Sequence, residues 1–276
     1  MGTEDNNIRT RDIDKMDTLK IVETIHLEDI RAYEAVGCAK ESIAKVIDSI
    51  YERVTAGGRV FYIGAGTSGR IAAQDVAELE PTYGIMYIFY YIMAGGNEAL
   101  AKSKEGAEDD REKAIEELKG YELNEKDVVI GITASGRTPF VVAAIEYGKS
   151  VGAYTVSITN NRNSVVSKIS DYSIVLDTGE EVIQGSTRMK AGTAQKMTLN
   201  IISTTLAIKL GKTDGNVMTH MKAFYNEKLK NRAVKILIDK FGIDEEKARK
   251  ILEMVNYNIP EALNLLKRSN SKPSVD

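Results

Sequence analysis

The sequence has no tryptophan, a single cysteine, two histidines and four prolines among its 276 residues. One cysteine, Cys38, excludes a disulfide within the chain, and with His26 and His220 it leaves too few soft ligands for a structural zinc site. Neither sign of charge dominates, because 37 basic and 40 acidic side chains give a formal net charge of −3. Such a chain has no broad positive field, so we expect no nucleic-acid partner. The shortage of soft ligands leads us to expect no metal site either.

Long hydrophobic runs are also missing. The longest covers residues 85–94, ten residues, whereas a helix needs about 20 to cross a bilayer. Its β-branched and aromatic residues, followed by two glycines, favour a buried central strand instead. The first 16 residues are charged and have no apolar core, so we expect neither a signal peptide nor an anchor. We therefore expect a cytoplasmic protein with no membrane partner.

From residue 57 onward, short apolar segments alternate with segments of helical periodicity. The predicted strands are residues 59–63, 85–93, 127–133, 153–158 and 171–176. The predicted helices are residues 68–79, 97–104, 109–118, 139–151 and 190–210. Alternation of this kind predicts an α/β fold with a doubly wound parallel sheet.

Helical segments flank this core on both sides. Residues 17–56 carry helical periodicity before the first strand, and three short amphipathic segments near the C-terminus predict a small three-helix bundle. Those segments are residues 233–241, 244–255 and 259–268. The predicted organisation is an N-terminal helical segment at 1–48, a sheet domain at 49–225, and a C-terminal bundle with its tail at 226–276.

One glycine-rich turn, Gly64-Ala-Gly-Thr-Ser-Gly-Arg70, follows a predicted strand and opens a predicted helix. Glycines allow a close backbone approach, and the free N–H groups of a helix start favour an anion. The string also matches the dinucleotide-binding pattern, but the next strand ends without the carboxylate that would bind a ribose. A phosphate-type turn is favoured, and a plain helix cap is the alternative. The candidate ligand-binding residues are Gly66, Thr67, Ser68 and Arg70.

A second turn of this kind, Thr133-Ala-Ser-Gly-Arg-Thr-Pro139, lies between another predicted strand and helix. Two Ser-Gly-Arg turns on one sheet can converge on one crevice and hold a phosphate or sugar hydroxyls. The candidates here are Ser135, Gly136, Arg137 and Thr138. A third hydroxyl-rich helix start at residues 185–196 adds Ser186 and Lys190. Ordinary serine caps are the alternative for the two Ser-Gly-Arg turns, and an N-cap with a solvated basic face is the alternative for the third helix start.

Two carboxylates are candidates for acid–base chemistry. Glu78 lies at the end of the helix begun by the first turn, and Glu108 lies 30 residues later in an acidic segment. Acidic residues near helix ends are ordinarily solvated or capping, so their spacing alone does not assign them a role.

The turn at 64–70 resembles that of sugar isomerase (SIS) domains. More specifically, the order and spacing of several segments resemble the N-acetylmuramic acid 6-phosphate etherase family, over about residues 3–268. These segments are residues 10–15, 78–84, 94–96, 105–110, 134–139, 185–196 and 226–229. The three C-terminal helices resemble the ubiquitin-associated-like (UBA-like) bundle of that family.

The resemblance implies a homodimer, formed through the N-terminal segment, that needs no cofactor. It also implies cleavage of the lactyl ether of N-acetylmuramic acid 6-phosphate, giving N-acetylglucosamine 6-phosphate and D-lactate. Glu78 and Glu108 take the positions of the family's acid–base pair for elimination of lactate and hydration. The sugar phosphate would lie on Thr67 and Ser68 of the first turn and on residues 135–138 of the second.

The chain departs from the family pattern beside Glu78, where Glu80 adds a third carboxylate. Fold does not settle activity, because glucokinase regulatory protein belongs to the wider group and binds sugar phosphates without catalysis. A non-catalytic sugar-phosphate regulator is therefore the main alternative. An aldose–ketose isomerase is less favoured, because only His26 and His220 could supply histidine to its acid–base set. The presence of both Glu78 and Glu108 favours the enzyme.

Overall fold

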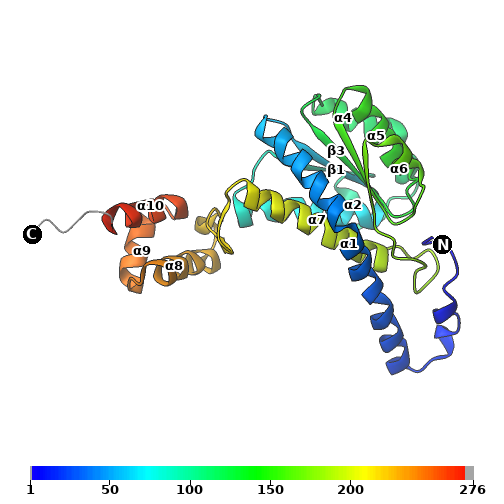
Figure 1. Ribbon diagram of the computed structural model, residues 1–276, viewed down its shortest axis with the longest axis horizontal. Helices are drawn as coiled ribbons and strands as arrows, with labels where there is room; N and C mark the ends of the chain where they lie inside the picture. The colour runs from blue at the N-terminus through cyan, green and yellow to red at the C-terminus, as the bar shows by residue number, and fades with distance from the viewer. Residues whose placement is uncertain (1, 271–276) are drawn as a thin grey trace, which may run out of the picture. The chain divides into compact units, whose positions relative to one another are not determined.

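The computed structural model describes residues 2–270 (Figure 1). Its contacts divide the chain into two compact units. The sheet unit comprises the residues up to Val76 together with Tyr87–Leu206. The helical unit comprises Ala77–Met86 together with the residues from Ala207 onward. The long helices α2 (Gly66–Tyr83) and α7 (Lys190–Lys209) contribute residues to both units.

The sheet unit is built on five parallel strands in the order β2-β1-β3-β4-β5. The strands are β1 (Val60–Gly64), β2 (Phe89–Met93), β3 (Val128–Thr133), β4 (Tyr154–Thr159) and β5 (Tyr172–Val175). This confirms the predicted doubly wound α/β fold. The direction of winding reverses between β1 and β3, and ligands of such folds bind at that switch point, beyond the carboxyl ends of the strands.

The second strand differs from its prediction. The apolar run at 85–93 was expected to be a central strand, but β2 begins only at Phe89 and lies at the edge of the sheet. Tyr87, with φ of 61°, adopts the left-handed conformation and precedes the extended segment. The aromatic residues of β2 pack onto a face of the sheet: the Tyr90 ring lies 5.1 Å from the rings of both Phe61 and Tyr121.

Helices cover both faces of this sheet (Figure 1). On one face, Phe61 and Ile63 pack with residues of α4 (Arg111–Gly120) and α5 (Pro139–Ser150). Tyr62, the residue between them, is fully buried on the other face near Asp75 of α2. The alternation along β1 follows from the period of two in a strand, and it places an apolar layer on each face.

The N-terminal part of the sheet unit is dominated by α1 (Thr18–Thr55), which begins where the Asp17 side chain accepts a hydrogen bond from the Lys20 amide. Two short 3-10 helices, η1 (Ile8–Thr10) and η2 (Ile13–Lys15), precede it. The Thr10 hydroxyl donates to the Val182 carbonyl at 2.7 Å. The start of the chain is thereby packed against the loop that leads into α7. The remaining short helices are α3 (Glu98–Ala101), η3 (Ala107–Asp109) and α6 (Val165–Ile169).

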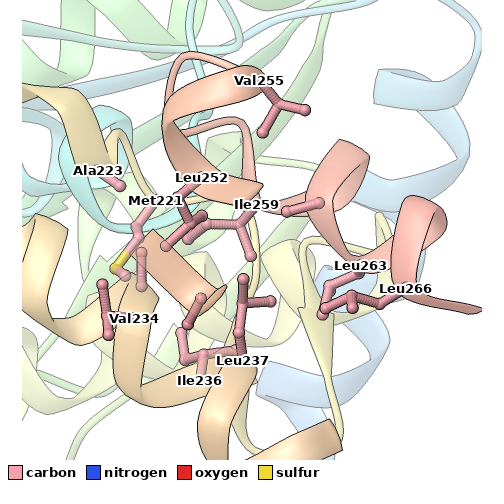
Figure 2. Close-up of a cluster of buried hydrophobic side chains, with 13 residues drawn as sticks. Met221, Ala223, Val234, Ile236, Leu237, Leu252, Val255, Ile259, Leu263 and Leu266 are labelled. Atoms are coloured by element: carbon pink, nitrogen blue, oxygen red, sulfur yellow. The ribbon is translucent and has the colours of Figure 1, made fainter. Parts of the chain in front are cut away.

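The helical unit contains the predicted three-helix bundle, formed by α8 (Glu227–Phe241), α9 (Glu245–Met254) and α10 (Ile259–Asn270). Its buried apolar side chains gather between the three helices, as Figure 2 shows. Helix α8 starts six residues earlier than predicted, because the Asn226 side chain accepts from the Leu229 amide and caps it. A short hairpin, β6 (Thr213–Asp214) and β7 (Val217–Met218), and the 3-10 helix η4 (Ala223–Tyr225) precede the bundle.

Candidate active site

The two predicted ligand-binding turns lie side by side at the switch point of the sheet. Strands β1 and β3 are adjacent and parallel, with Gly64 in register with Ile132, so both turns start at the same edge. A Cβ on Gly64 would lie 2.7 Å from the Gly69 nitrogen, so the turn closes only without side chains there. Gly66 has φ of 53° and is exposed, which leaves the N-terminal N–H groups of α2 available to an anion.

A buried chain of hydrogen bonds ties the first turn to its neighbours. The Ser68 hydroxyl donates to Gln195 Oε1 at 2.8 Å, and Gln195 Nε2 donates to Asn160 Oδ1 at 2.9 Å. The backbone N–H of Asn160 donates in turn to the Ala134 carbonyl, at 3.1 Å. These hydrogen bonds therefore connect the turns after β1, β3 and β4 through the Gln195 side chain of α7. Sequence reasoning did not select Gln195 or Asn160; the available signal for Asn160 was a polar residue directly after a buried strand.

The second turn is held by its own side chains. Thr133 Oγ1 lies 2.8 Å from Thr138 Oγ1 and accepts from the Gly136 amide at 3.2 Å. Gly136 has φ of 71°, and a Cβ there would lie 2.2 Å from the Ser164 Cβ. Ser135 is half-buried and Arg137 is exposed. The turn is therefore rigid, while a hydroxyl and a guanidinium remain accessible on it.

The third predicted turn lies beside the first, but its lysine is engaged elsewhere. Gly192 of α7 packs against Thr67, because a Cβ on Gly192 would lie 3.1 Å from Thr67 Cγ2. Ser186 is half-buried just before α7. Lys190 is fully buried, and its ammonium donates to Glu28 Oε2 at 2.6 Å and to the Glu180 carbonyl at 2.5 Å. Lys190 thus forms an ion pair with Glu28 that joins α7 to α1.

Glu28 is the acceptor on which this ion pair depends. Arg9 Nε also donates to Glu28, at 2.5 Å, and the Asn7 amide donates to it at 2.9 Å. Burial raises the pKa of Glu28, but the hydrogen bonds from Arg9, Lys190 and Asn7 outweigh it and hold that pKa at about 2. The carboxylate therefore stays ionised at neutral pH.

Glu108 lies beside the first turn, on the wall of a cavity of about 230 Å³ within the sheet unit. The same cavity is lined by Gly66 and Arg70, whose Nε donates to the Leu100 carbonyl at 3.1 Å. Glu108 itself is exposed in η3. The structure thus brings together one predicted acid–base residue and two residues of the predicted phosphate turn.

The other candidate carboxylates belong to the helical unit. Glu78 is exposed on the last part of α2. Glu80, the carboxylate added by this chain, accepts a hydrogen bond from the Tyr225 hydroxyl at 2.5 Å, and that bond raises the pKa of Tyr225. Of the two predicted catalytic glutamates, Glu108 thus belongs to the sheet unit and Glu78 to the helical unit. Glu80 is hydrogen-bonded to Tyr225.

Among residues 2–270, no helix is both long and apolar enough to span a bilayer. The same residues contain no cluster of three or more His, Cys, Asp or Glu side chains arranged to hold a metal ion. Histidine is absent from the Glu108 cavity: His26 is exposed on α1, and His220, whose pKa is lowered by burial, lies in the helical unit.

Comparison with known families and folds agrees with this geometry. Residues 42–149 match the glucokinase regulatory protein N-terminal SIS domain, and residues 114–204 match the SIS domain. The phosphoheptose isomerases of Francisella tularensis and Neisseria gonorrhoeae share the fold, with TM-scores of 0.54 and 0.52 and 16% identity. These matches cover 72% and 69% of this chain and 100% and 98% of the two isomerases.

Three clostridial proteins named N-acetylmuramic acid 6-phosphate etherase are similar over nearly the whole chain. The protein of Clostridium botulinum strain Okra is 45% identical over 98% of this chain and 89% of its own length. That of Clostridium beijerinckii is 47% identical over 95% and 86%, and that of Clostridioides difficile strain 630 is 46% identical over 99% and 90%. The chain belongs to the N-acetylmuramic acid 6-phosphate etherase family.

Proposed function

We propose that the protein cleaves the lactyl ether of N-acetylmuramic acid 6-phosphate to N-acetylglucosamine 6-phosphate and D-lactate. The observation that carries the proposal is the near full-length similarity to relatives that bear the etherase name. A crevice at the switch point of the sheet, with an exposed carboxylate beside its phosphate-type turn, supports it.

In this proposal the two turns bind the sugar phosphate. The N–H groups at the start of α2 and the side chains of Thr67 and Ser68 face a phosphate, and the turn starting at Ser135 contacts ring hydroxyls. The Ser68 hydroxyl now donates to Gln195. A hydrogen bond from this hydroxyl to phosphate is charge-assisted and about twice as strong as the neutral one, and it must offset the loss of the donor to Gln195 Oε1.

The reaction needs a base and an acid on the same sugar. The base removes the proton at C2 while the acid protonates the ether oxygen at C3, so that lactate leaves and a C2–C3 double bond forms. Water then adds across that bond, its oxygen to C3 and a proton to C2. Glu78 and Glu108 take these two roles, and their environments in the complex must separate their pKa values.

The proposal includes a homodimer. It also includes a cytoplasmic location, because a phosphorylated sugar is charged and does not cross a membrane unaided. One face of α1 carries four apolar side chains that are 48–71% exposed: Leu19, Val22, Ile30 and Tyr33. Their spacing keeps them within one stripe of the helix, and contiguous exposed apolar side chains are typical of protein–protein interfaces. We call this set the α1 stripe, and propose that it pairs with a second copy through residues 1–48.

Incubation of the protein with N-acetylmuramic acid 6-phosphate tests the activity. The expected result is stoichiometric formation of D-lactate and N-acetylglucosamine 6-phosphate. Binding of the sugar phosphate without any lactate would instead support the non-catalytic regulator.

A further inference from the structure

The lining of the cavity that contains Glu108 holds two cations, Arg70 and Lys104, and a second carboxylate, Glu105. Arg70 lies on one wall, at the start of α2, and Lys104 lies on the segment that leads into η3. Its volume of about 230 Å³ is below the roughly 300–1,000 Å³ of pockets that enclose a whole small ligand. The cavity therefore suits a substituent of the sugar better than the complete sugar phosphate.

Both cations can bind an anion in this cavity. Lys104 Nζ lies 3.9 Å from Glu98 Oε2, with the two side chains 58% and 89% exposed, and such a pair contributes little. The Arg70 side chain is anchored through Nε to the Leu100 carbonyl, a bond that leaves its two terminal amino groups for a ligand. An anchored guanidinium and an accessible ammonium on the same cavity wall together match a carboxylate.

The rest of the lining suits a small aliphatic group. It includes the apolar side chains of Ala65, Met93, Ala94, Ala99 and Ala107. The segment that carries Lys104 and Glu108 is packed onto Gly95, which has φ of 85°, because a Cβ there would approach Ala99, Lys104 and Ala107 within 3.0–3.3 Å. The compact segment thus holds an ammonium and a carboxylate on the wall of one cavity.

We propose that Arg70 and Lys104 form the subsite for the carboxylate of the lactyl group, beside Glu108. This inference rests on the proposed function and names the part of the substrate that the cavity selects. In the lactyl ether, the carbon that carries both the carboxylate and the methyl group is bonded directly to the ether oxygen. A carboxylate held by Lys104 and Arg70 therefore positions the bond to be broken near Glu108, while the alanines contact the methyl group.

Replacement of Lys104 tests this subsite, because the side chain is exposed and its loss leaves no buried group unpaired. For Lys104→Gln, we expect kcat/KM for lactate release to fall at least about tenfold, the effect of losing one hydrogen bond to a charged group. The affinity for N-acetylglucosamine 6-phosphate, which lacks the lactyl group, stays within about twofold of wild type. Lys104→Arg restores most of the activity. Lys102→Gln, an exposed lysine that does not line the cavity, is the matched control and leaves both quantities unchanged.

Two results would overturn the subsite: an unchanged kcat/KM in Lys104→Gln, or an equal loss of affinity for sugar phosphates with and without the lactyl group. Failure of the proposed function has a different signature, namely no lactate from the wild-type protein. In that case binding still decides the inference. A preference of wild type for the lactyl sugar that disappears in Lys104→Gln supports the subsite, and a preference that persists overturns it.

Discussion

At the scale of single residues, the candidate site depends on polar side chains that have little access to water. Ser68, Gln195 and Asn160 are each at most 8% exposed, and each has a partner in the hydrogen-bonded chain. A buried polar atom that loses its partner costs more than the lost hydrogen bond was worth, since water cannot replace it. Gln195 is the central member, because it serves as acceptor for one neighbour and donor for the other.

Replacing Gln195 by leucine is expected to destabilise the protein by about 1–3 kcal/mol, because the Ser68 hydroxyl and the Asn160 oxygen both lose their partner. Urea unfolding of the two proteins measures the difference. Thr193→Leu, an exposed position on the same helix, is the control and should change stability by no more than about 0.5 kcal/mol. Equal stability of Gln195→Leu and wild type would show that the hydrogen bonds of Gln195 to Ser68 and Asn160 do not stabilise the fold.

The position of the two glycine turns could be predicted from sequence because each is a local pattern: strand, glycine turn, helix start. The buried ion pair of Lys190 could not be predicted, because its partner Glu28 is 162 residues away in the chain. The same holds for Gln195, whose partner Ser68 is 127 residues away. Local patterns predict where a backbone turns, whereas the pairing of a particular side chain depends on the complete fold.

At the scale of elements, the start of α7 is fixed by two buried carboxylates. Glu181 accepts from the backbone amides of Lys190 and Ala191, and burial raises the pKa of Glu181. Glu28 of α1 binds the Lys190 ammonium, and its pKa is lowered from 4.5 to about 2. Because the folded-state pKa is depressed, the stabilisation by Glu28 is complete above about pH 4.5 and is lost as the pH falls toward 2.

Removing the charge of Glu28 alone should be severe. We expect Glu28→Gln to cost about 3–5 kcal/mol, because the Lys190 ammonium stays buried without a counter-charge. The double substitution Glu28→Gln with Lys190→Met removes both charges and should recover much of that loss. Thermal or urea unfolding gives the free energy of unfolding of wild type, both single variants and the double variant, which together form a double-mutant cycle. A double variant as unstable as the sum of its single variants would contradict the ion pair.

At the scale of the whole molecule, the alternation of strands and helices could be predicted because each element has its own periodicity. The position of β2 could not: its apolar sequence favoured a central strand, but strand order depends on packing between distant elements. Tyr90 is an example, since its ring packs against Phe61 of the neighbouring strand and against Tyr121, which follows α4. The amphipathic bundle of the helical unit was predicted as three helices, with only the start of α8 misplaced.

The α1 stripe leads to a prediction about assembly. Val22→Glu combined with Ile30→Glu places two charges on the stripe, and we expect the proposed dimer to dissociate into monomers at micromolar concentration. Light scattering after size-exclusion chromatography measures the mass. Met254→Glu, which alters an apolar side chain 78% exposed on α9, is the matched control and keeps the dimer. A double variant that remains fully dimeric would exclude the stripe as the interface.

The most direct test of the account is the rate of D-lactate release by three amide variants. Glu78→Gln and Glu108→Gln keep the shape of the side chain but cannot transfer a proton, which typically lowers a rate by about 10²–10⁴. Glu80→Gln removes the extra carboxylate, whose partner is Tyr225, and should keep most of the activity. Both catalytic variants should still bind N-acetylglucosamine 6-phosphate, because the phosphate turns are made of other residues. We expect two nearly inactive variants and one active control. Full activity in Glu108→Gln, or loss of activity in Glu80→Gln alone, would contradict the assignment of Glu78 and Glu108 as the acid–base pair.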